Sequence, residues 1–295
     1  MPLSVIRPSN AQRSPARNGV ICGCLVRHCV GRKMTTFPFI AVDVGNAQIK
    51  LGLFSSAGTG CIAQPEQTWR LPSNGLLQPE SLPALSACGS GQLSWWIGSV
   101  NRPAASRLID FLREHRPGDR VVLLSARDLP LQVAVPRPDM VGVDRLLDAL
   151  AANRLRKPDR PAVVVDVGTA ITVDLVSAEG AFCGGAILPG IGMSARALHQ
   201  FTDLLPLLDM TELQQPPPAL GTDTVAAMRS GLYWGAVGAV RELVERLSEN
   251  LSHKPQVFIT GGAGPAVAQL LGSEAQHVPH LTLSGIAIAA EAIGL

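Results

Sequence analysis

The sequence predicts an α/β protein made of two related lobes, and three observations support this. Hydrophobic residues make up 46% of the 295-residue chain but aromatic residues only 4%, so the apolar mass consists largely of Ala, Val and Leu, as buried strands require. Strand-like runs alternate with stretches that have helical spacing. One strand–turn–strand pattern occurs twice, at 38–54 and at 161–177.

In the N-terminal half, a β-rich apolar run interrupted by Gly45 and Asn46 predicts a strand, a tight turn and a second strand over 38–54. A segment of low regularity, rich in Gly, Pro and Ser, follows at 55–92. Beyond it we expect a buried strand, a helix, another strand and another helix, over 93–100, 103–116, 120–125 and 141–156.

The C-terminal half opens with the second strand–turn–strand pattern, at 161–177, which a hairpin connects to a further strand. The rest of the pattern predicts a helix, a proline-rich loop, a long helix, a strand ending in Gly261-Gly262 and a final helix, over 190–205, 214–221, 222–250, 256–261 and 282–293. Thr222 or Asp223 is the expected N-cap of the long helix.

Charge and composition narrow the classes of partner. A formal net charge of +2 is too small to favour nucleic acid or an acidic membrane as the main partner. No apolar run is long and clean enough to span a bilayer. Because the cysteines show neither a CxxC pair nor a metal-binding spacing, we expect reduced thiols in a cytoplasmic protein.

Residues 1–35 differ from the rest of the chain, because they contain Arg and Lys but no acidic residue. Two interpretations fit this composition. One is a disordered tail or an upstream extension ahead of Met34, and the other is an organelle transit peptide. The first is the simpler and is the one we expect.

The repeated turn carries the chemistry. Asp43 and Asp166 each end an apolar strand, where a carboxylate can face a cation or its waters. The glycine two residues later, Gly45 in the first copy, allows a tight turn whose N–H groups can face phosphate oxygens. A single Asp-x-Gly is as often an ordinary turn. Two copies at matching strand ends favour a phosphate and cation site, and hence a phosphotransferase.

Side chains around the two turns agree with that interpretation. Asn46 and Thr169 supply polar groups at equivalent positions, and Lys50 can offset phosphate charge beside the first copy. No GxxxxGK[ST] motif occurs, so a Walker-type nucleotide site is not expected.

Six segments in order resemble the type III pantothenate kinases, which belong to the superfamily of acetate and sugar kinases, heat-shock chaperones and actin. They are DVGNAQIKLGLF (43–54), GSVNRP (98–103), GVDR (142–145), DVGTAITVDLV through GGAILPG (166–190), GTDTVAAMRSG (221–231) and TGGAG (260–264). The resemblance covers residues 38–294. It implies an actin-like ATPase fold of two ribonuclease-H-like lobes with mixed sheets flanked by helices, an N-terminal lobe at 36–155 and a C-terminal lobe at 156–295.

The resemblance also implies an activity, which is the ATP-dependent phosphorylation of pantothenate to 4′-phosphopantothenate, the first step towards coenzyme A, by a homodimer. In this family's pattern Asp43 would hold Mg²⁺, and Gly45, Asn46 and Lys50 fall in the segment that binds the ATP phosphates. Asp144 matches the catalytic base that accepts the proton of the pantothenate hydroxyl.

The remaining roles implied by the resemblance concern substrate and cation. Arg145, the backbone of Gly142 and Val143, and Thr224 match pantothenate contacts. Asp166 matches the ligand of a monovalent cation, K⁺ or NH₄⁺, and Thr169 matches an ATP-binding position. From the residues alone, an Asp-Arg pair that opens a helix is more often a cap or a surface ion pair.

The chain departs from the family's pattern at three positions. Ala47 stands where a Thr or Ser is usual, Thr222 where a Lys is frequent, and Val135 where a Tyr is frequent. Ala47 and Val135 keep one alternative open, a non-catalytic regulator on the same fold. A kinase of another small hydroxylated acid or sugar is a further alternative. An actin-like filament former is the least expected.

Overall fold

The computed structural model describes residues 38–55, 62–78, 82, 91–209, 215–262, 264, 272 and 275–294. Residues Met34–Leu295 form one compact unit, to which the following description applies. The predicted tail at 1–35 lies outside the described residues, as does Ala263 of the TGGAG segment.

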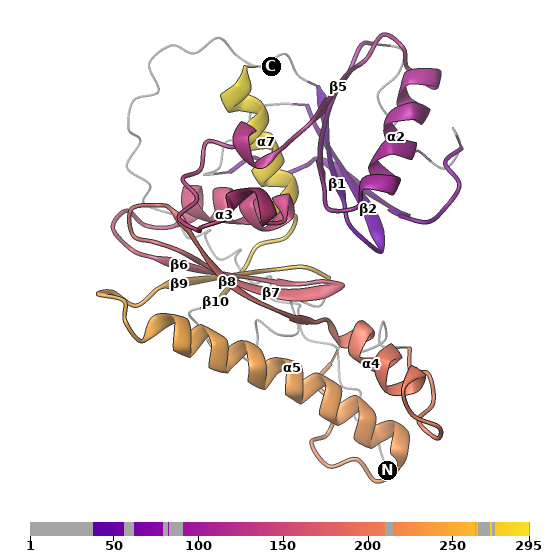
Figure 1. Cartoon of the computed structure of the whole chain (residues 1–295), viewed down its shortest axis with the longest axis vertical. Coiled ribbons are helices and arrows are strands. Elements are labelled where there is room, and N and C mark those ends of the chain that lie inside the picture. The colour runs from indigo at the N-terminus through magenta and orange to yellow at the C-terminus, as the bar shows by residue number, and fades with distance from the viewer. Residues whose placement is uncertain are drawn as a thin grey trace, which may run out of the picture. The chain divides into compact units, whose positions relative to one another are not determined.

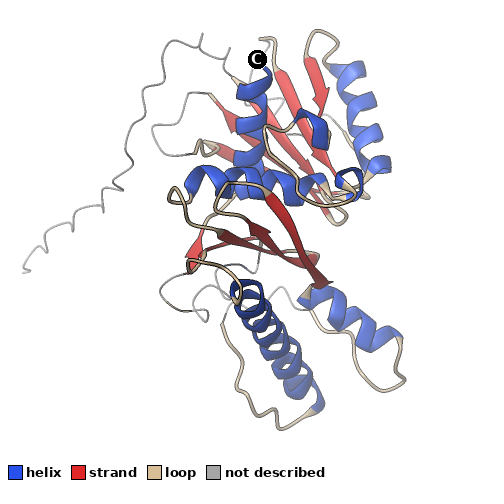
Figure 2. Ribbon diagram, turned by 60° about the vertical axis from the view of Figure 1, so that its left-hand side comes forward, coloured by secondary structure: helices blue, strands red, loops and turns tan. Residues whose placement is uncertain are grey.

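Two five-stranded sheets form the framework of this unit (Figures 1 and 2). The first consists of β1 (Phe39–Val44), β2 (Gln48–Phe54), β3 (Gln67–Pro72), β4 (Ser94–Ser99) and β5 (Arg120–Leu123). The second consists of β6 (Ala162–Val167), β7 (Ala170–Val176), β8 (Phe182–Pro189), β9 (Gln256–Thr260) and β10 (Ala275–His277).

The two sheets have the same topology. Their strand orders are β3-β2-β1-β4-β5 and β8-β7-β6-β9-β10. In each, the first three strands in the chain pair antiparallel, the fourth pairs parallel to the first, and the fifth pairs parallel to the fourth. The repeat found in the sequence is therefore a repeat of whole sheets, and the predicted ribonuclease-H-like architecture of two mixed sheets is confirmed.

The longer helices among the described residues are α2 (Arg102–His115), α3 (Val143–Leu155), α4 (Ile191–Gln200), α5 (Thr224–Ser248) and α7 (Leu281–Ile293). Two short 3₁₀ helices lie at Ala126–Asp128 and Pro138–Met140. The starts of α2 and α5 follow capping rules, since Asn101 accepts a hydrogen bond from Ala104 N and Asp223 accepts one from Ala226 N. Of the two N-caps expected for the long helix, Asp223 is the one that forms.

The helices and sheets share three main hydrophobic cores. One lies between the two sheets, where α3 and α7 contribute Leu147 and Ile286. The outer face of the first sheet packs against α2, and the outer face of the second packs against α5, as Figure 1 shows. Because side chains alternate along a strand, the central helices contact every second residue of the strands beside them.

Most predicted elements are present within one or two residues of their expected bounds, but β3 lies in the segment 55–92, which the sequence did not assign to a strand. Its residues are mostly exposed and it forms an edge of the first sheet. This edge strand pairs with β2 and packs Trp69 and Leu71 against the core of the first sheet, but two alternating apolar residues are too short a pattern to predict a strand.

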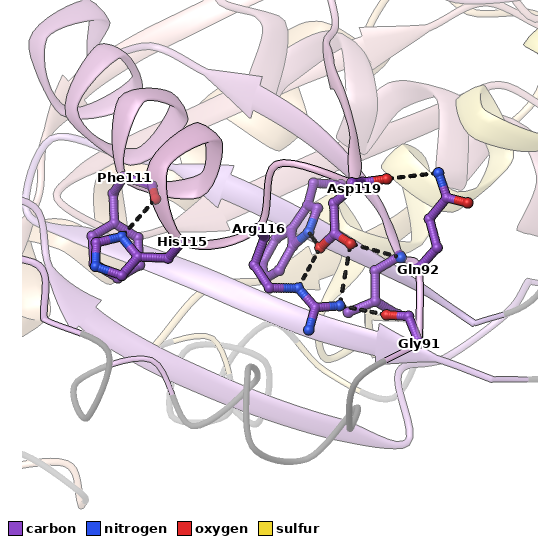
Figure 3. A network of polar contacts seen from close by, with 9 residues as sticks. Gly91, Gln92, Phe111, His115, Arg116 and Asp119 are labelled. Carbon is purple, nitrogen blue, oxygen red and sulfur yellow. Dashed lines mark hydrogen bonds and ion pairs between the residues drawn. The ribbon is translucent and has the colours of Figure 1, made fainter.

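Polar contacts around Asp119 hold the starts of β4 and β5 together (Figure 3). Its carboxylate accepts hydrogen bonds from Leu93 N at 3.0 Å, Trp95 Nε1 at 2.8 Å and Arg116 Nε at 2.9 Å, and Arg116 also donates to the carbonyl of Gly91. Burial alone would raise the pKa of Asp119, but these hydrogen bonds hold it below its ordinary value. The network is structural.

Candidate active site

The two repeated aspartates face the central helices. On β1, Phe39 and Ala41 belong to the core between the sheets, so Asp43 continues that row at the end of the strand. Asp166 continues the equivalent row on β6, after Ala162 and Val164. Both carboxylates are therefore directed to the side of the sheets where α3 and α7 pack.

The two hairpins differ by one residue. In the first, Val44 pairs with Ile49, and in the second, Val167 pairs with Ile171. The first turn thus contains four residues (45–48) and the second three (168–170). A shift of one residue moves a side chain to the other face of a sheet. Because of the longer turn, the residue opposite Asp43 is Lys50, seven positions later, whereas the residue opposite Asp166 is Thr172, six positions later.

The cross-strand partners make the two aspartates inequivalent. Lys50 Nζ lies 3.1 Å from Asp43 Oδ2 and forms a partly buried ion pair. Burial alone would lower the pKa of Lys50, but the carboxylates of Asp43 and Asp166 outweigh it and raise the pKa. Asp166 lies opposite Thr172, which carries no charge, and its Oδ1 is buried without a hydrogen bond in the described part of the chain.

This difference appears in the electrostatics of Asp166. Burial, partly offset by the charge of Lys50, raises the pKa of Asp166 to about 6, and Asp43 contributes in the same direction. Among the described residues, no cationic side chain forms an ion pair with Asp166, although the charge of Lys50 acts on it, and this arrangement suits a bound cation.

The start of α3 brings Asp144 into the same group. Its Oδ1 accepts a hydrogen bond from Arg145 N at 2.8 Å. Burial raises the pKa of Asp144, and the charges of Asp43 and Asp174 add to the shift. Gly142, the N-cap residue of α3, is needed here, because a Cβ on it would lie 2.5 Å from Asp144 Oδ1. A raised pKa at a largely buried carboxylate is typical of a residue that exchanges protons.

The structure gives Arg145 a partner that the sequence did not suggest. Its Nε lies 3.1 Å from each carboxylate oxygen of Asp174, its Nη2 also donates to Asp174, and its guanidinium lies 5.5 Å from the centre of the Phe182 ring. Within the described residues its Nη1 donates to none. Arg145 is therefore held in one orientation with one edge still open.

Asp148 is a second residue that sequence reasoning missed. It is 3% exposed, and its Oδ1 has no hydrogen-bond partner among the described residues. Burial raises its pKa well above the ordinary value, and the neighbouring charge of Asp166 acts in the same direction. A usable signal existed, because Asp148 lies four residues after Asp144 and so faces the same side of α3.

Main-chain contacts fix the second turn. Gly190 N donates to Thr169 O at 3.1 Å, and a Cβ on Gly190 would lie 2.3 Å from Gly168 O. At the end of β9, Gly261 has a φ of +91°, and a Cβ there would lie 2.4 Å from Asp166 Oδ1. The glycine-rich turn after β9 is thus part of the wall around Asp166, which the sequence indicated only weakly.

Two predicted residues lie outside this group. Val143 is 8% exposed and packs in the core between the sheets, so only its backbone is available to a substrate. Thr224 begins α5 and lines an apolar groove of about 940 Å³ formed with α4, together with Met193, Phe201 and Met228.

The group as a whole fits a cation better than any single residue does. Its charged members, five carboxylates and two cations, are Asp43, Asp144, Asp148, Asp166, Asp174, Lys50 and Arg145. If all are ionised, three negative charges remain in excess. Within the described residues, no three His, Cys, Asp or Glu side chains converge to hold a metal ion by themselves. A hard cation here would complete its shell with phosphate oxygens and water.

Comparisons with known proteins agree with this geometry. Residues 39–246 match the family model described as type III pantothenate kinase. A type III pantothenate kinase from Nocardia farcinica is 36% identical over 263 residues, covering 84% of this chain and 94% of the relative. The kinase of the same name from Gluconobacter oxydans is 39% identical over 195 residues, covering 66% of this chain and 70% of the relative.

Solved structures agree on the fold. A putative 2-dehydro-3-deoxygalactonokinase from Sinorhizobium meliloti superposes with a TM-score of 0.51 at 14% identity, covering 86% of this chain and 99% of that one. The activator of the 2-hydroxyisocaproyl-CoA dehydratase from Clostridium difficile gives a TM-score of 0.50 at 11% identity, covering 88% and 96%. At these identities the likeness concerns the fold alone.

Proposed function

Because the chain belongs to the type III pantothenate kinase family, we propose that Asp144 is the base that activates pantothenate for phosphorylation by ATP. Family membership makes the chain an ATP-dependent kinase of pantothenate, an enzyme of coenzyme A biosynthesis. The role of Asp144 rests on its place at the start of α3, where it is close enough to Asp43 of the first hairpin for that charge to raise its pKa.

The proposed chemistry needs positioning and charge neutralisation more than covalent help. Asp144 would accept the proton of the pantothenate primary hydroxyl as the oxygen attacks the γ-phosphate. Its raised pKa improves it as a base while leaving it ionised at higher pH. The second edge of Arg145, held by Asp174, would donate to the substrate carboxylate, together with the backbone of Gly142 and Val143.

The ATP phosphates would lie against the two turns, with Gly45, Asn46 and Lys50 on one side and Thr169 on the other. A divalent cation, Mg²⁺, would be held by Asp43, and a monovalent cation, K⁺ or NH₄⁺, by Asp166. Such cations neutralise charge on the transferring phosphoryl group. The unpartnered Oδ1 of Asp166 and the excess of carboxylates support this assignment.

We further propose a cytoplasmic homodimer with lobes at 36–155 and 156–295. Support for the dimer comes from the groove between α4 and α5, beside which Phe201 and Leu204 are largely exposed. In the described residues, none of the helices combines the length and the apolar character needed to cross a membrane.

An ADP-release assay with pantothenate, Mg²⁺ and K⁺ tests the role of Asp144. Asp144→Asn keeps the shape of the side chain but cannot accept the proton, so kcat should fall by about 10²- to 10⁴-fold. In the wild type, kcat/KM should fall as the pH drops through the raised pKa of Asp144, at higher pH than for an ordinary carboxylate.

The matched control is Asp139→Asn, which changes an exposed aspartate just before α3 and should leave the turnover unchanged. Full turnover in Asp144→Asn would contradict the proposed role. A wild type that binds nucleotide without phosphorylating pantothenate would favour the regulator, and turnover of a different hydroxylated acid or sugar would change the substrate.

A further inference from the structure

We propose that Ser73 is a positioning residue for ATP, which holds the first hairpin turn so that the main-chain N–H of Asn46 faces the nucleotide phosphates. The inference rests on the proposed function, in which that turn receives the phosphates. Ser73 follows β3 directly and is 3% exposed, although the residues on either side of it are exposed.

Ser73 contacts the turn at two points. Its Oγ donates a hydrogen bond to Gly45 O at 2.7 Å, and its N–H donates to Ala47 O at 3.0 Å. Within the turn, Gly45 N donates to Gln48 O at 3.0 Å. Gly45 N–H is thus already used, contrary to the expectation that it faces phosphate. Ser73, which follows a different strand, therefore donates to two carbonyl groups of the turn, those of Gly45 and Ala47.

The orientation of one N–H follows from peptide geometry. In a planar trans peptide the carbonyl and the next N–H point in opposite directions. Because Gly45 O accepts from Ser73, the N–H of Asn46 points away from Ser73. Asn46 is exposed, and its N–H donates to none of the described residues. A free N–H in a tight turn is a donor for a phosphate oxygen.

Two features make the contact between Ser73 and the turn important for phosphate binding. Ala47 brings no hydroxyl to the turn, so the turn's donors are main-chain N–H groups and the Asn46 side chain. Ser73 is itself held from α2, because Arg107 Nη2 donates to Ser73 O at 2.5 Å. The resulting chain of contacts runs from α2 through Ser73 to the turn.

The test measures KM for ATP and for pantothenate separately in Ser73→Ala. Loss of one hydrogen bond that orients the turn should raise the KM for ATP about fivefold and leave the KM for pantothenate unchanged. The matched control is Ser284→Ala, which removes another buried hydroxyl that donates to a main-chain carbonyl, that of Ala63, at 2.8 Å. It should lower stability without changing the KM for ATP.

A second pair of variants keeps the proposal testable if Ser73→Ala does not fold. Arg107→Gln removes the contact to Ser73 from an exposed position and should raise the KM for ATP in the same direction. Arg113→Gln, on the same helix, removes only an exposed ion pair to Asp110 and should not.

Calorimetry with a non-hydrolysable ATP analogue separates this proposal from the proposed function. Equal dissociation constants for wild type and Ser73→Ala, or equal effects of Ser73→Ala and Ser284→Ala on the KM for ATP, would overturn the role of Ser73 alone. A wild type that binds the analogue but does not phosphorylate pantothenate would contradict the function, while the ratio of dissociation constants would still decide the role of Ser73.

Discussion

At the scale of single residues, the buried carboxylates dominate the chemistry of the candidate site. Taking a carboxylate out of water is costly unless it is paired, and Asp148 and Asp166 each have one buried oxygen without a partner among the described residues. Asp43 avoids that cost through Lys50, and Asp174 through Arg145. The unpaired positions are those where a ligand or a proton has most to contribute.

Asp148 gives a prediction about stability and pH. Its folded pKa is raised, so its contribution to stability is present in full below the ordinary carboxyl pKa and is lost as the pH rises through the folded pKa. Asp148→Asn cannot ionise, so it should be more stable than the wild type at pH 8 and similar to it at pH 4. The difference can grow by up to about 1.4 kcal/mol per pH unit.

Thermal denaturation at several pH values, without added Mg²⁺ or K⁺, checks this expectation. Asp110→Asn changes an exposed carboxylate and serves as the control, with an effect of no more than about 0.5 kcal/mol at any pH. If the difference in unfolding free energy between wild type and Asp148→Asn stays constant from pH 4 to pH 8, Asp148 is not the source of the pH dependence of stability.

At the scale of elements, the crossing of α3 and α7 decides where Asp144 and Asp148 lie. Gly285 of α7 touches the backbone of α3, since a Cβ on it would lie 2.1 Å from Leu147 O. Gly98 of β4 is similarly close, with a Cβ 2.7 Å from Leu147 Cδ1. Small residues therefore let α3 pack closely against both, and α3 carries Asp144 and Asp148.

Gly285→Ala tests this close approach. Although Ala favours a helix, its methyl group would push α7 from α3, and the variant should lose about 1–3 kcal/mol of unfolding free energy together with kinase activity. In Gly238→Ala, on the exposed side of α5, the new Cβ meets nothing within 4 Å, so the substitution should stabilise by about 0.5–1 kcal/mol. Chemical denaturation compares the two, and equal effects would refute the account.

At the scale of the whole unit, two sheets of one topology enclose a single group of charges. The pairing is unequal, because the first sheet supplies an ion pair and the second supplies an unpaired carboxylate. The excess of negative charge lies where strands of both sheets end beside α3 and α7. Binding of a cation should therefore stabilise the folded unit as well as assist the reaction.

Cation binding can be followed by melting temperature in the absence of nucleotide. Potassium chloride should raise the Tm of the wild type above its value in tetramethylammonium chloride of equal ionic strength, because only the smaller ion fits between buried carboxylates. At saturating salt the rise in Tm should correspond to about 1–3 kcal/mol of added unfolding free energy, and it should disappear in Asp166→Asn. Equal Tm values in the two salts, or an unchanged response in Asp166→Asn, would argue against a site at Asp166.

The sequence by itself determined the α/β class, the repeated hairpins and most of the helices and strands, because each of these depends on local periodicity and turn chemistry. The family followed instead from the resemblance of six ordered segments. The repeat also predicted that Asp43 and Asp166 each end an apolar strand, as β1 and β6 show. The roles of the site residues remain predictions.

Only the tertiary structure decided the contacts between distant segments. Ser73 follows an edge strand with only a short apolar pattern, and Asp174 meets Arg145 from another element. Strand register places Lys50 opposite Asp43 and the uncharged Thr172 opposite Asp166. Each depends on strand register and helix packing, which bring together residues far apart in the chain, and local periodicity carries no information about such distances.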